Sequence, residues 1–388
     1  MRRIYLDHNA TTPLDPRVLE VMTAALRDDF GNPSSLHWFG QRARAALDGA
    51  RGQVAALLGA SPNEIVFTGS GTEADNLALR GVAGISRPPR RKILYSAFEH
   101  HAVVNTAKAL AEEDVPTEAI RATADGLVDL DDLDRRLDDG VALVVVMLAN
   151  NETGLIQPVA EIARRARAKG ALVFCDAVQG AGKIPIDVRA LDVDLLAVSA
   201  HKFYGPKGAG ALFVRRGTRL RALLRGGSQE KNRRAGTENV AAIVGMGRAA
   251  ALAREALAAE AVRESGLRDA FEARLLQIPG ALRNGEGPRV PNTTNVSFDG
   301  IEAESLLMAL DLAGVAVSTG AACAAGAIEP SHVLRAMGLP MSRIEGSLRF
   351  SIGRGTTEDD LSAAAGAVAE AVARQRLLAT KRPAASRR

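Results

Sequence analysis

The sequence predicts an α/β protein with two units: a large one built on a mainly parallel sheet covered by helices, and a smaller α+β one. Apolar segments alternate with segments of helical periodicity from residue 65 to residue 214. Several apolar segments, such as Ala-Leu-Val-Val-Val-Met-Leu at residues 142–148, are hydrophobic throughout. Such strands are typical of parallel sheets that are buried on both faces, and these sheets bind ligands at the carboxyl ends of their strands.

The large unit is expected to begin with two helices, the first of them introduced by Asp15 and Pro16, because proline suits the first turn of a helix. Strands and helices then alternate along the chain. The expected helices cover residues 17–29, 40–58, 72–82, 102–113, 130–137 and 158–169, and the expected strands cover residues 65–68, 92–96, 117–121, 142–148, 171–175, 193–198 and 209–214.

An Ala-rich helical region follows at residues 240–275, and we expect its glycines, Gly245, Gly247 and Gly266, to break it. The order of elements changes after Pro279, which indicates the second unit. We predict a large domain over residues 14–260 and a small domain formed by residues 1–13 and 261–388. The small domain is expected to hold strands at residues 293–298 and 348–352, helices at 302–312 and 358–378, and the extended residues 4–12.

The composition is that of an ordinary globular protein, with 47% hydrophobic and 24% charged residues in a chain of 388. No apolar run approaches the ~18 residues that a membrane span needs. The net charge of +4 comes from basic residues after Glu370, and only 4% of residues are aromatic, which argues against a nucleic-acid surface. Two cysteines make no disulfide framework, and Asp7 interrupts any signal segment, so we expect a cytoplasmic protein.

A lysine and an aspartate follow two of the expected strands. Lys202 comes after the strand at residues 193–198 and before a loop rich in glycine and proline, so that its amine can project into a cleft. Asp176 stands at the carboxyl end of the strand at residues 171–175. An amine that forms a Schiff base and an acid that pairs with a pyridinium nitrogen are what pyridoxal phosphate requires. A lone lysine here would more often be a surface residue, but the aspartate favours the cofactor site.

The string Gly-Ser-Gly-Thr-Glu-Ala at residues 69–74 follows a strand and opens a helix. Backbone amides at a helix N-terminus favour an anion such as phosphate. The string also fits the dinucleotide fingerprint, so a nicotinamide-dependent dehydrogenase is an alternative. That alternative needs an acid about 20 residues further on, whereas Glu99 lies beyond that distance and is followed by two histidines. We therefore prefer a monophosphate site, with a plain tight turn as the simpler interpretation.

Two further polar segments follow strands. A neutral imidazole in Glu99-His100-His101 could stack on an aromatic cofactor and relay protons, although a helix cap or a packing role is more usual for one histidine. The amides of Asn150-Asn151-Glu152 could bind a phenolic oxygen, and turn formation explains these residues equally well.

Residues 318–327 are small and rich in glycine, so we expect a flexible loop that presents the thiol of Cys323. Cys175 lies within an expected strand, where a buried, inert thiol is usual. Arg349 places one cation in an apolar strand. Its partner would be a substrate carboxylate, bound through two parallel hydrogen bonds, or an internal acid, and the sequence favours neither.

In this order, the motifs resemble those of the NifS/IscS-like cysteine desulfurases, in the class-V aminotransferase group of fold-type-I pyridoxal phosphate enzymes. The resemblance covers residues 4–357, and the string at residues 234–239 looks more like the NifS side of the family. The matching strings are Tyr-Leu-Asp-His-Asn-Ala-Thr-Thr (5–12), Gly-Asn-Pro-Ser-Ser (31–35), Gly-Thr-Glu-Ala-Asp-Asn (71–76), Glu-His (99–100), Asn-Asn-Glu (150–152), Asp-Ala-Val-Gln (176–179), Ser-Ala-His-Lys (199–202), Arg-Ala-Gly-Thr-Glu-Asn (234–239) and Arg-Phe-Ser-Ile-Gly-Arg (349–354).

The resemblance implies the type-I fold, with a mainly parallel seven-stranded sheet, and pyridoxal 5'-phosphate as cofactor. Lys202 would hold the cofactor covalently, Asp176 would pair with its ring nitrogen, and His100 would stack on the ring and shuttle a proton. Gln179 and Asn151 would contact the phenolic oxygen. The phosphate would be held by Gly71, Thr72, Ser199 and His201, and by Thr237 from the second subunit of a homodimer.

The implied reaction removes sulfur from L-cysteine, gives L-alanine and leaves a persulfide on Cys323. Arg349 and Asn32 would bind the substrate carboxylate. The persulfide would pass to an iron–sulfur scaffold or another sulfur acceptor, and we expect neither a nucleic acid nor a membrane as partner. No intrinsic metal site is expected, although Cys323 could ligate a transferred iron–sulfur cluster.

The sequence departs from the family at the cysteine loop, where Ala322, Ala324 and Ala325 replace the usual Ser or Thr and remove hydrogen-bond donors to the thiolate. The same fold would also suit a selenocysteine lyase or an ordinary transaminase. A protein that binds the cofactor without catalysis is a further alternative.

Overall fold

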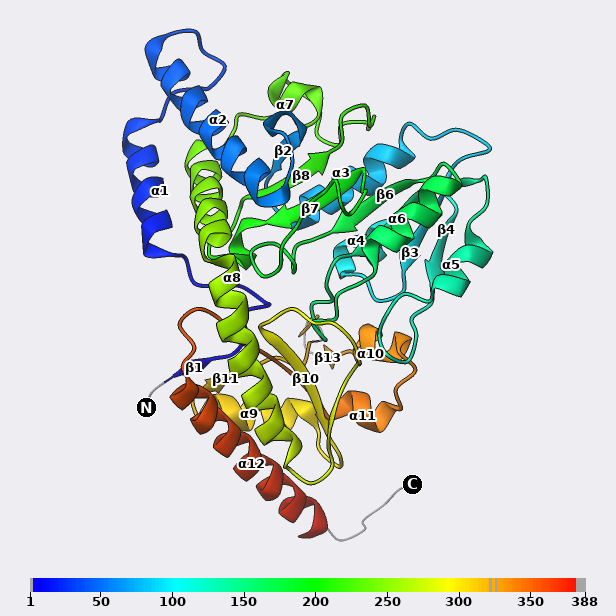
Figure 1. The fold of residues 1–388 in the computed structure, drawn as a ribbon, viewed down its shortest axis with the longest axis vertical. Coiled ribbons are helices and arrows are strands. Elements are labelled where there is room, and N and C mark those ends of the chain that lie inside the picture. The colour runs from blue at the N-terminus through cyan, green and yellow to red at the C-terminus, as the bar shows by residue number, and fades with distance from the viewer. Residues whose placement is uncertain (1–2, 321–322, 325–326, 382–388) are drawn as a thin grey trace.

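The computed structural model describes residues 3–320, 323–324 and 327–381, with side chains described over residues 3–320 and 329–378. Figure 1 shows a large sheet flanked by helices in the upper part of the molecule and a smaller β unit below it. The long helix α8 (Val240–Leu276) runs from one part to the other. None of the described helices is long and apolar enough to cross a membrane.

The large sheet has seven strands in the order β2-β8-β7-β6-β5-β3-β4. Only β8 runs antiparallel to its neighbours in this sheet, and the other pairs are parallel. The mainly parallel sheet is thereby confirmed. The strands are β2 (Ile65–Thr68), β3 (Lys92–Ser96), β4 (Thr117–Ile120), β5 (Val141–Met147), β6 (Leu172–Asp176), β7 (Leu195–Ser199) and β8 (Gly210–Val214), each within two residues of its expected bounds.

Both faces of this sheet are covered, because successive side chains of a strand point to opposite sides. In β5, Leu143 and Val145 pack with residues of α3 and α4, whereas Val144 and Val146 pack with residues of α2, α6 and α8. The helices of the large unit that precede α8 are α1 (Pro16–Asp28), α2 (Trp38–Leu58), α3 (Gly71–Ala83), α4 (His101–Glu112), α5 (Leu130–Arg136), α6 (Val159–Ala168) and the short α7 (Gln229–Asn232).

The smaller unit contains the antiparallel sheet β14-β10-β9 and a parallel pair, β1 with β11. Its core joins residues 4 and 6 to residues between 271 and 372. The predicted boundary after residue 260 falls inside α8, and the division into two domains stays a prediction. The elements are β1 (Ile4–Tyr5), β9 (Ala281–Arg283), β10 (Thr293–Phe298), α9 (Ala303–Leu312), β11 (Val315–Ala316), β12 (Cys323–Ala324), β13 (Ala327–Ile328), α10 (His332–Ala336), α11 (Met341–Glu345), β14 (Ser347–Ser351) and α12 (Glu358–Lys381).

The expectation that glycines break the Ala-rich helix is wrong, since α8 is continuous from Val240 to Leu276. A Cβ atom on Gly247 would lie 2.6 Å from Ala50 Cα in α2, and one on Gly245 would lie 2.6 Å from Met22 Sδ in α1. These two glycines therefore let α8 approach its neighbours closely. The packing offsets their low helix propensity, which is a weak preference that tertiary contacts override.

The glycines of α8 lead to opposite expectations for substitution by alanine. Gly247→Ala should lower the free energy of unfolding by about 1–3 kcal/mol, because the added methyl group overpacks the contact with Ala50. Gly266→Ala should raise it by up to about 1 kcal/mol, since a Cβ there meets no atom within 4 Å and alanine favours the helix. Urea unfolding of both variants at one protein concentration checks this, and equal shifts would contradict it.

Candidate active site

A cavity of about 240 Å³ opens at the carboxyl edge of the large sheet. It lies where β5, β6 and β7 end and where α3 begins, which is the edge at which parallel sheets bind ligands. Its lining contains most of the predicted site residues, together with some that the sequence did not single out. The lining residues are Ser70, Gly71, Thr72, Asp75, His100, Met147, Ala149, Asn151, Asp176, Val178, Gln179, Ser199, His201 and Lys202.

Lys202 and Asp176 reach this cavity from the ends of two adjacent parallel strands. Asp176 is the last residue of β6, and its Oδ1 accepts a hydrogen bond from Val178 N at 2.9 Å. Lys202 ends a single 3₁₀ turn, Ala200–Lys202, that follows β7. Its Nζ donates to the backbone oxygens of Asn9 and Ala10 at 2.6 and 2.8 Å.

The burial of these two groups disfavours their charged forms. The pKa of the Lys202 amine is lowered to about 8, chiefly by burial and also by the positive charge of Arg349. The carboxylates of Asp176 and Asp7 act in the opposite direction. Burial raises the pKa of Asp176 to about 6, while the Val178 hydrogen bond and the Lys202 charge act in the opposite direction. An amine with such a pKa is partly neutral near pH 8, and only a neutral amine is nucleophilic.

The part of the cavity lining at the start of α3 is suited to an anion. Gly71 and Thr72 begin α3, a helix of 13 residues, whose first turn is capped by the Ser70 side chain at Glu73 N. A Cβ on Gly71 would lie 2.9 Å from Val178 Cγ2, so the contact requires glycine. His201 contacts Thr11 Oγ1 through Nδ1 at 3.1 Å, and burial lowers the pKa of His201 to about 4, which leaves the ring neutral.

His100 caps the N-terminus of α4, where its Nδ1 accepts a hydrogen bond from Ala102 N at 3.1 Å. His100 is exposed where it borders the cavity, but the protein packed around the ring still desolvates it, and this lowers the pKa of His100 to about 4. The neutral ring therefore carries its proton on Nε2. The next residue, His101, packs instead against His332 with ring centroids 4.6 Å apart, so of these two neighbouring histidines His100 is the one that lines the cavity.

Three buried polar atoms of the cavity lining have no hydrogen-bond partner among the described residues: Asp75 Oδ1, Asn151 Oδ1 and Ser199 Oγ. Buried polar groups are almost always paired, because leaving one unpaired costs about 1–3 kcal/mol. Unmet donors and acceptors around a cavity indicate a polar ligand. Ser199 Oγ–H can donate to a phosphate, whereas the Asp75 and Asn151 oxygens accept and need a donor such as a phenolic O–H or a protonated ring nitrogen. Pyridoxal phosphate carries groups of both kinds.

Asp75 was not predicted as a site residue. It lies in the second turn of α3, and burial together with the charges of Asp176 and Glu99 raises its pKa. In the sequence, the only indication of a role for Asp75 was its place within the string Gly-Thr-Glu-Ala-Asp-Asn at residues 71–76. Asn150, in contrast, forms the turn after β5, because its Oδ1 accepts hydrogen bonds from Glu152 N and Thr153 N at 2.9 and 3.0 Å.

Arg349 does not line the cavity. Its Nη2 pairs with Asp7 Oδ1 at 2.6 Å and its Nη1 donates to the backbone oxygen of Asn151 at 3.0 Å. This is the internal ion pair that the sequence left open as an alternative. Arg349 Nε has no partner among the described residues, so binding of a substrate carboxylate by Arg349 stays a prediction.

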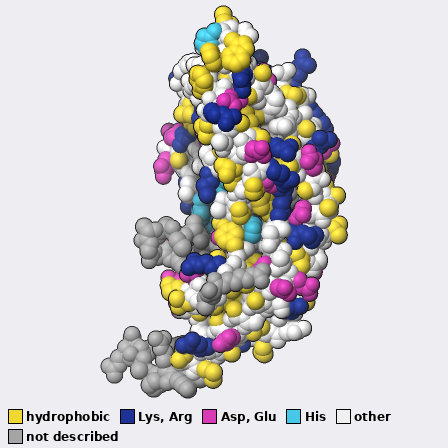
Figure 2. All heavy atoms as spheres, turned by 90° about the vertical axis from the view of Figure 1, so that its left-hand side faces the viewer, with side chains coloured by type: hydrophobic (Ala, Val, Ile, Leu, Met, Phe, Trp, Pro, Cys, Tyr) yellow, Lys and Arg dark blue, Asp and Glu magenta, His cyan; other side chains and the backbone are white. Residues whose placement is uncertain are grey.

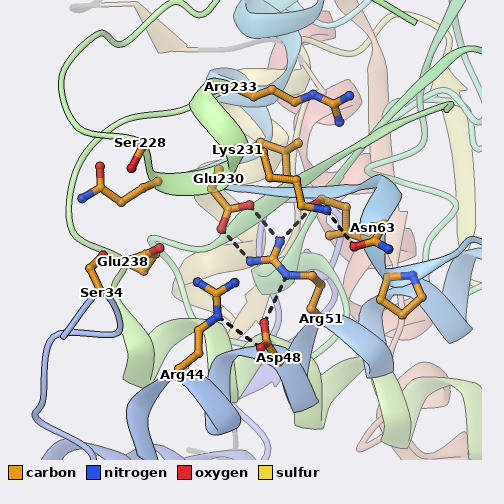
Figure 3. A pocket seen from close by; sticks show the side chains of 14 residues that line it. Ser34, Arg44, Asp48, Arg51, Asn63, Ser228, Glu230, Lys231, Arg233 and Glu238 are labelled. Carbon is orange, nitrogen blue, oxygen red and sulfur yellow. Dashed lines mark hydrogen bonds and ion pairs between the residues drawn. The ribbon is translucent and has the colours of Figure 1, made fainter. Parts of the chain in front are cut away.

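Asn32 and Thr237 are exposed and also do not line the cavity. Asn32 lies two residues before Ser34, and Thr237 lies one residue before Glu238. Ser34 and Glu238 line a second, polar cavity of about 380 Å³. Figure 3 shows Glu230 and Arg51 facing each other there, with Arg44 and Asp48 paired beside them. The predicted contact of Thr237 with the cofactor of a second subunit stays a prediction.

The ion pair between Glu230 and Arg51 anchors the segment that carries Thr237. Arg51 Nη1 and Nη2 donate to the two carboxylate oxygens at 2.8 and 2.6 Å, and Phe67 N donates to Glu230 Oε2 at 2.9 Å. Arg234, further along this segment, donates to Glu73 Oε1 in the first turn of α3 at 2.9 Å. The segment at residues 230–239 is thus attached to β2 and to the helix that begins at the cavity.

Cys323 begins the two-residue strand β12, which pairs antiparallel with β13, so a small hairpin lies where we expected a loop. The side chain of Cys323, and the loop positions 321–322 and 325–326, lie outside the described part of the structure. Cys175 is fully buried in β6, as predicted, and burial raises its pKa. No set of three or more metal-ligating side chains is grouped within the described residues.

Arg51→Met should lower the free energy of unfolding by about 3 kcal/mol, because it leaves the Glu230 carboxylate buried without its cation. Arg44→Met is the matched control: both partners of the Arg44–Asp48 pair are about half exposed, so the loss should stay below about 1 kcal/mol. Urea unfolding monitored by circular dichroism measures both, and equal losses would contradict the anchoring role of Glu230.

The chain was compared with known proteins. Residues 4–363 match the class-V aminotransferase family. A cysteine desulfurase of Trichormus azollae is 47% identical over 380 residues, which cover 97% of this chain and 95% of that protein. A solved NifS-like protein is 38% identical with a TM-score of 0.90, covering 96% of this chain and 99% of the other. SspA, solved in complex with cysteine, is 33% identical with a TM-score of 0.81, covering 90% and 98%. The chain belongs to the class-V aminotransferase family, among the cysteine desulfurases.

Proposed function

We propose that this protein is a cysteine desulfurase that uses pyridoxal 5'-phosphate to take sulfur from L-cysteine. The observation that carries the proposal is the pair Lys202 and Asp176 in one cavity whose lining leaves three buried polar atoms unpaired. A lysine at this place is what pyridoxal phosphate requires and a nicotinamide site does not. The relation to cysteine desulfurases, and the neighbour solved with cysteine, support the choice of substrate.

Each end of the cofactor would meet a different part of the cavity. Lys202 would hold its aldehyde carbon, and Asp176 its ring nitrogen. The amides of Gln179 and Asn151 would face the phenolic oxygen, and the neutral ring of His100 would lie against the face of the cofactor. The phosphate would be held by Gly71, Thr72, Ser199 and His201, with Thr237 supplied by a second subunit.

When bound, pyridoxal phosphate supplies an electron sink for the charge that develops at the α carbon of the substrate. The Lys202 amine, with its lowered pKa, can take the α proton. His100, which carries its proton on Nε2, can donate it near the reacting atoms. The Cys323 thiolate attacks the substrate sulfur: an S–S bond forms, the Cβ–S bond breaks, and its electron pair passes to the β carbon, which becomes the methyl group of alanine on protonation.

A homodimer is part of the proposal, because Thr237 is exposed and is not among the residues that line the cavity of its own chain. An exposed apolar patch supports it. Phe30, Leu36, Trp38 and Phe39, at the α1–α2 connection, are 46–89% exposed. Figure 2 shows hydrophobic side chains gathered at the top of one face, where this connection lies in Figure 1. Such a patch on a globular protein commonly marks a protein–protein contact.

The persulfide on Cys323 would be passed to an iron–sulfur scaffold or another sulfur acceptor in the cytoplasm. Cys323 begins β12, which belongs to a sheet of two strands with β13 and to neither of the larger sheets. That placement suits a group that must be delivered to a second protein.

Cys323→Ala should abolish alanine formation from L-cysteine, a loss of at least about 100-fold, because no nucleophile remains to accept the sulfur. The absorbance of bound pyridoxal phosphate should be unchanged, since Cys323 holds no part of the cofactor. Cys175→Ala is the control: this thiol is buried in β6 and should be dispensable for turnover. Undiminished sulfur release by the Cys323 variant would refute the proposed function.

The uptake of pyridoxal phosphate by apoprotein should depend on pH with a midpoint near 8, the pKa to which burial lowers the Lys202 amine. Below that value the amine is protonated, so the rate should fall about tenfold for each pH unit, and above it the rate should level off. Stopped-flow absorbance measures the rate. A midpoint near 10, the ordinary value for lysine, would show that the buried setting does not activate the amine.

A further inference from the structure

Lys183 is a buried cation that the proposed reaction does not use. It lies four residues after Gln179, and the residue is 8% exposed. Its Nζ donates to Gln179 Oε1 at 2.6 Å and to Asn9 Oδ1 at 2.8 Å. A buried lysine is uncommon and costly, and burial lowers the pKa of Lys183 to about 7. Its two acceptors both belong to residues that contact the candidate active site.

The contact with Lys183 fixes which way the Gln179 amide points. Gln179 Nε2 donates to the backbone oxygen of Asn9 at 2.9 Å, while Oε1 accepts from Lys183. The reversed amide would set its NH₂ group against an ammonium and its oxygen against a carbonyl. The contact of the oxygen with the Asn9 carbonyl would be repulsive at any pH, and the contact with Lys183 would be repulsive while Lys183 carries its proton. Lys183 and the Asn9 carbonyl therefore favour the same orientation of the amide. Gln179 lines the cavity, and the second N–H of its amide has no hydrogen-bond partner among the described residues.

Asn9 links Lys183 to the amine of Lys202. The backbone oxygen of Asn9 accepts hydrogen bonds from both Lys202 Nζ and Gln179 Nε2, at 2.6 and 2.9 Å. Its Oδ1 accepts from Lys183, and its Nδ2 donates to the backbone oxygen of Asn151 at 3.1 Å. One residue of the N-terminal segment, through its side chain and its backbone oxygen, thus connects Lys183 to three residues of the cavity lining.

The surroundings of Lys183 contain both signs of charge. Lys202 and Arg349 oppose its positive charge, and Glu264 of α8 favours it. The neutral ring of His8 faces the same small cavity, of about 20 Å³, which has room for a single water molecule beside Lys183. A water there would accept the third N–H of the ammonium group.

We propose that Lys183 is a positioning residue that holds the amide of Gln179 in the orientation that donates to the phenolic oxygen of pyridoxal phosphate. The proposal rests on the proposed function, because it assigns the ring of that cofactor to the cavity.

The test is the affinity of apoprotein for pyridoxal phosphate, measured by absorbance titration in four proteins. These are the wild type, Lys183→Met, Gln179→Ala and the double variant. Lys183→Met keeps the shape of the side chain and removes the donor, and we expect it to raise the dissociation constant at least about tenfold. If Lys183 acts through Gln179, its substitution should add less than twofold in the Gln179→Ala background. Independent losses that multiply would overturn the proposal, because coupling is what distinguishes positioning from general destabilisation.

Lys207→Met is the matched control, since Lys207 is an exposed lysine of the loop that follows Lys202, and it should leave the affinity unchanged. Lys183→Gln is the second variant, to be used where Lys183→Met does not fold. It keeps a donor without the charge, and we expect a rise of about threefold in the wild-type background and none in the Gln179→Ala background. A rise in both backgrounds would count against the proposal.

The two hypotheses fail separately. A wild-type protein that neither binds pyridoxal phosphate nor forms alanine from cysteine would refute the proposed function. A wild type that does both, beside a Lys183→Met variant of equal cofactor affinity, would refute the role of Lys183 and leave the function standing.

Discussion

A cation inside a protein needs partners, and those of Lys202 are two backbone carbonyls of the N-terminal segment. The strand order brings β6 and β7 side by side, so Asp176 and Lys202 share one edge of the sheet. The sheet alone does not orient the amine. The oxygens of residues 9 and 10 do so from the far end of the chain. The same segment reaches Gln179 and Asn151 through Asn9, and the arrangement of the cavity depends on these contacts between the segment and the end of the sheet.

The sequence was sufficient to predict the elements of the large unit and the residues at their ends. Strands such as β5 are apolar throughout because both of their faces are buried, and this pattern is visible without coordinates. Parallel neighbours end at one edge, so Asp176, Asn151, His100 and Lys202 could be grouped before their positions were known. Gly71 was recognisable because a glycine after a strand and before a helix permits close backbone contact.

The remaining features depend on contacts between distant segments, which no local pattern records. Lys183 looks like an ordinary surface lysine in the sequence, and only the fold places it against Gln179 and Asn9. From the sequence, the low helix propensity of glycine suggested that the helix α8 would be broken at its glycines. In the structure the close packing of α8 against α1 and α2 keeps the helix continuous. The sequence allowed either an internal acid or a substrate carboxylate as the partner of Arg349. The structure pairs Arg349 with Asp7, 342 residues away.

The contact of residues 9 and 10 with Lys202 has a consequence for biosynthesis. His8 and Asn9 are held by Ser351, through its backbone oxygen and its hydroxyl group, across more than 340 positions. Contacts of such sequence separation form late, because the chain must first lose the entropy of closing a very long loop. A ribosome that has translated the whole large sheet has therefore not yet produced a chain able to orient Lys202. We expect the nascent protein to acquire its cofactor only after β14 has been synthesised and has paired with residues 8 and 9.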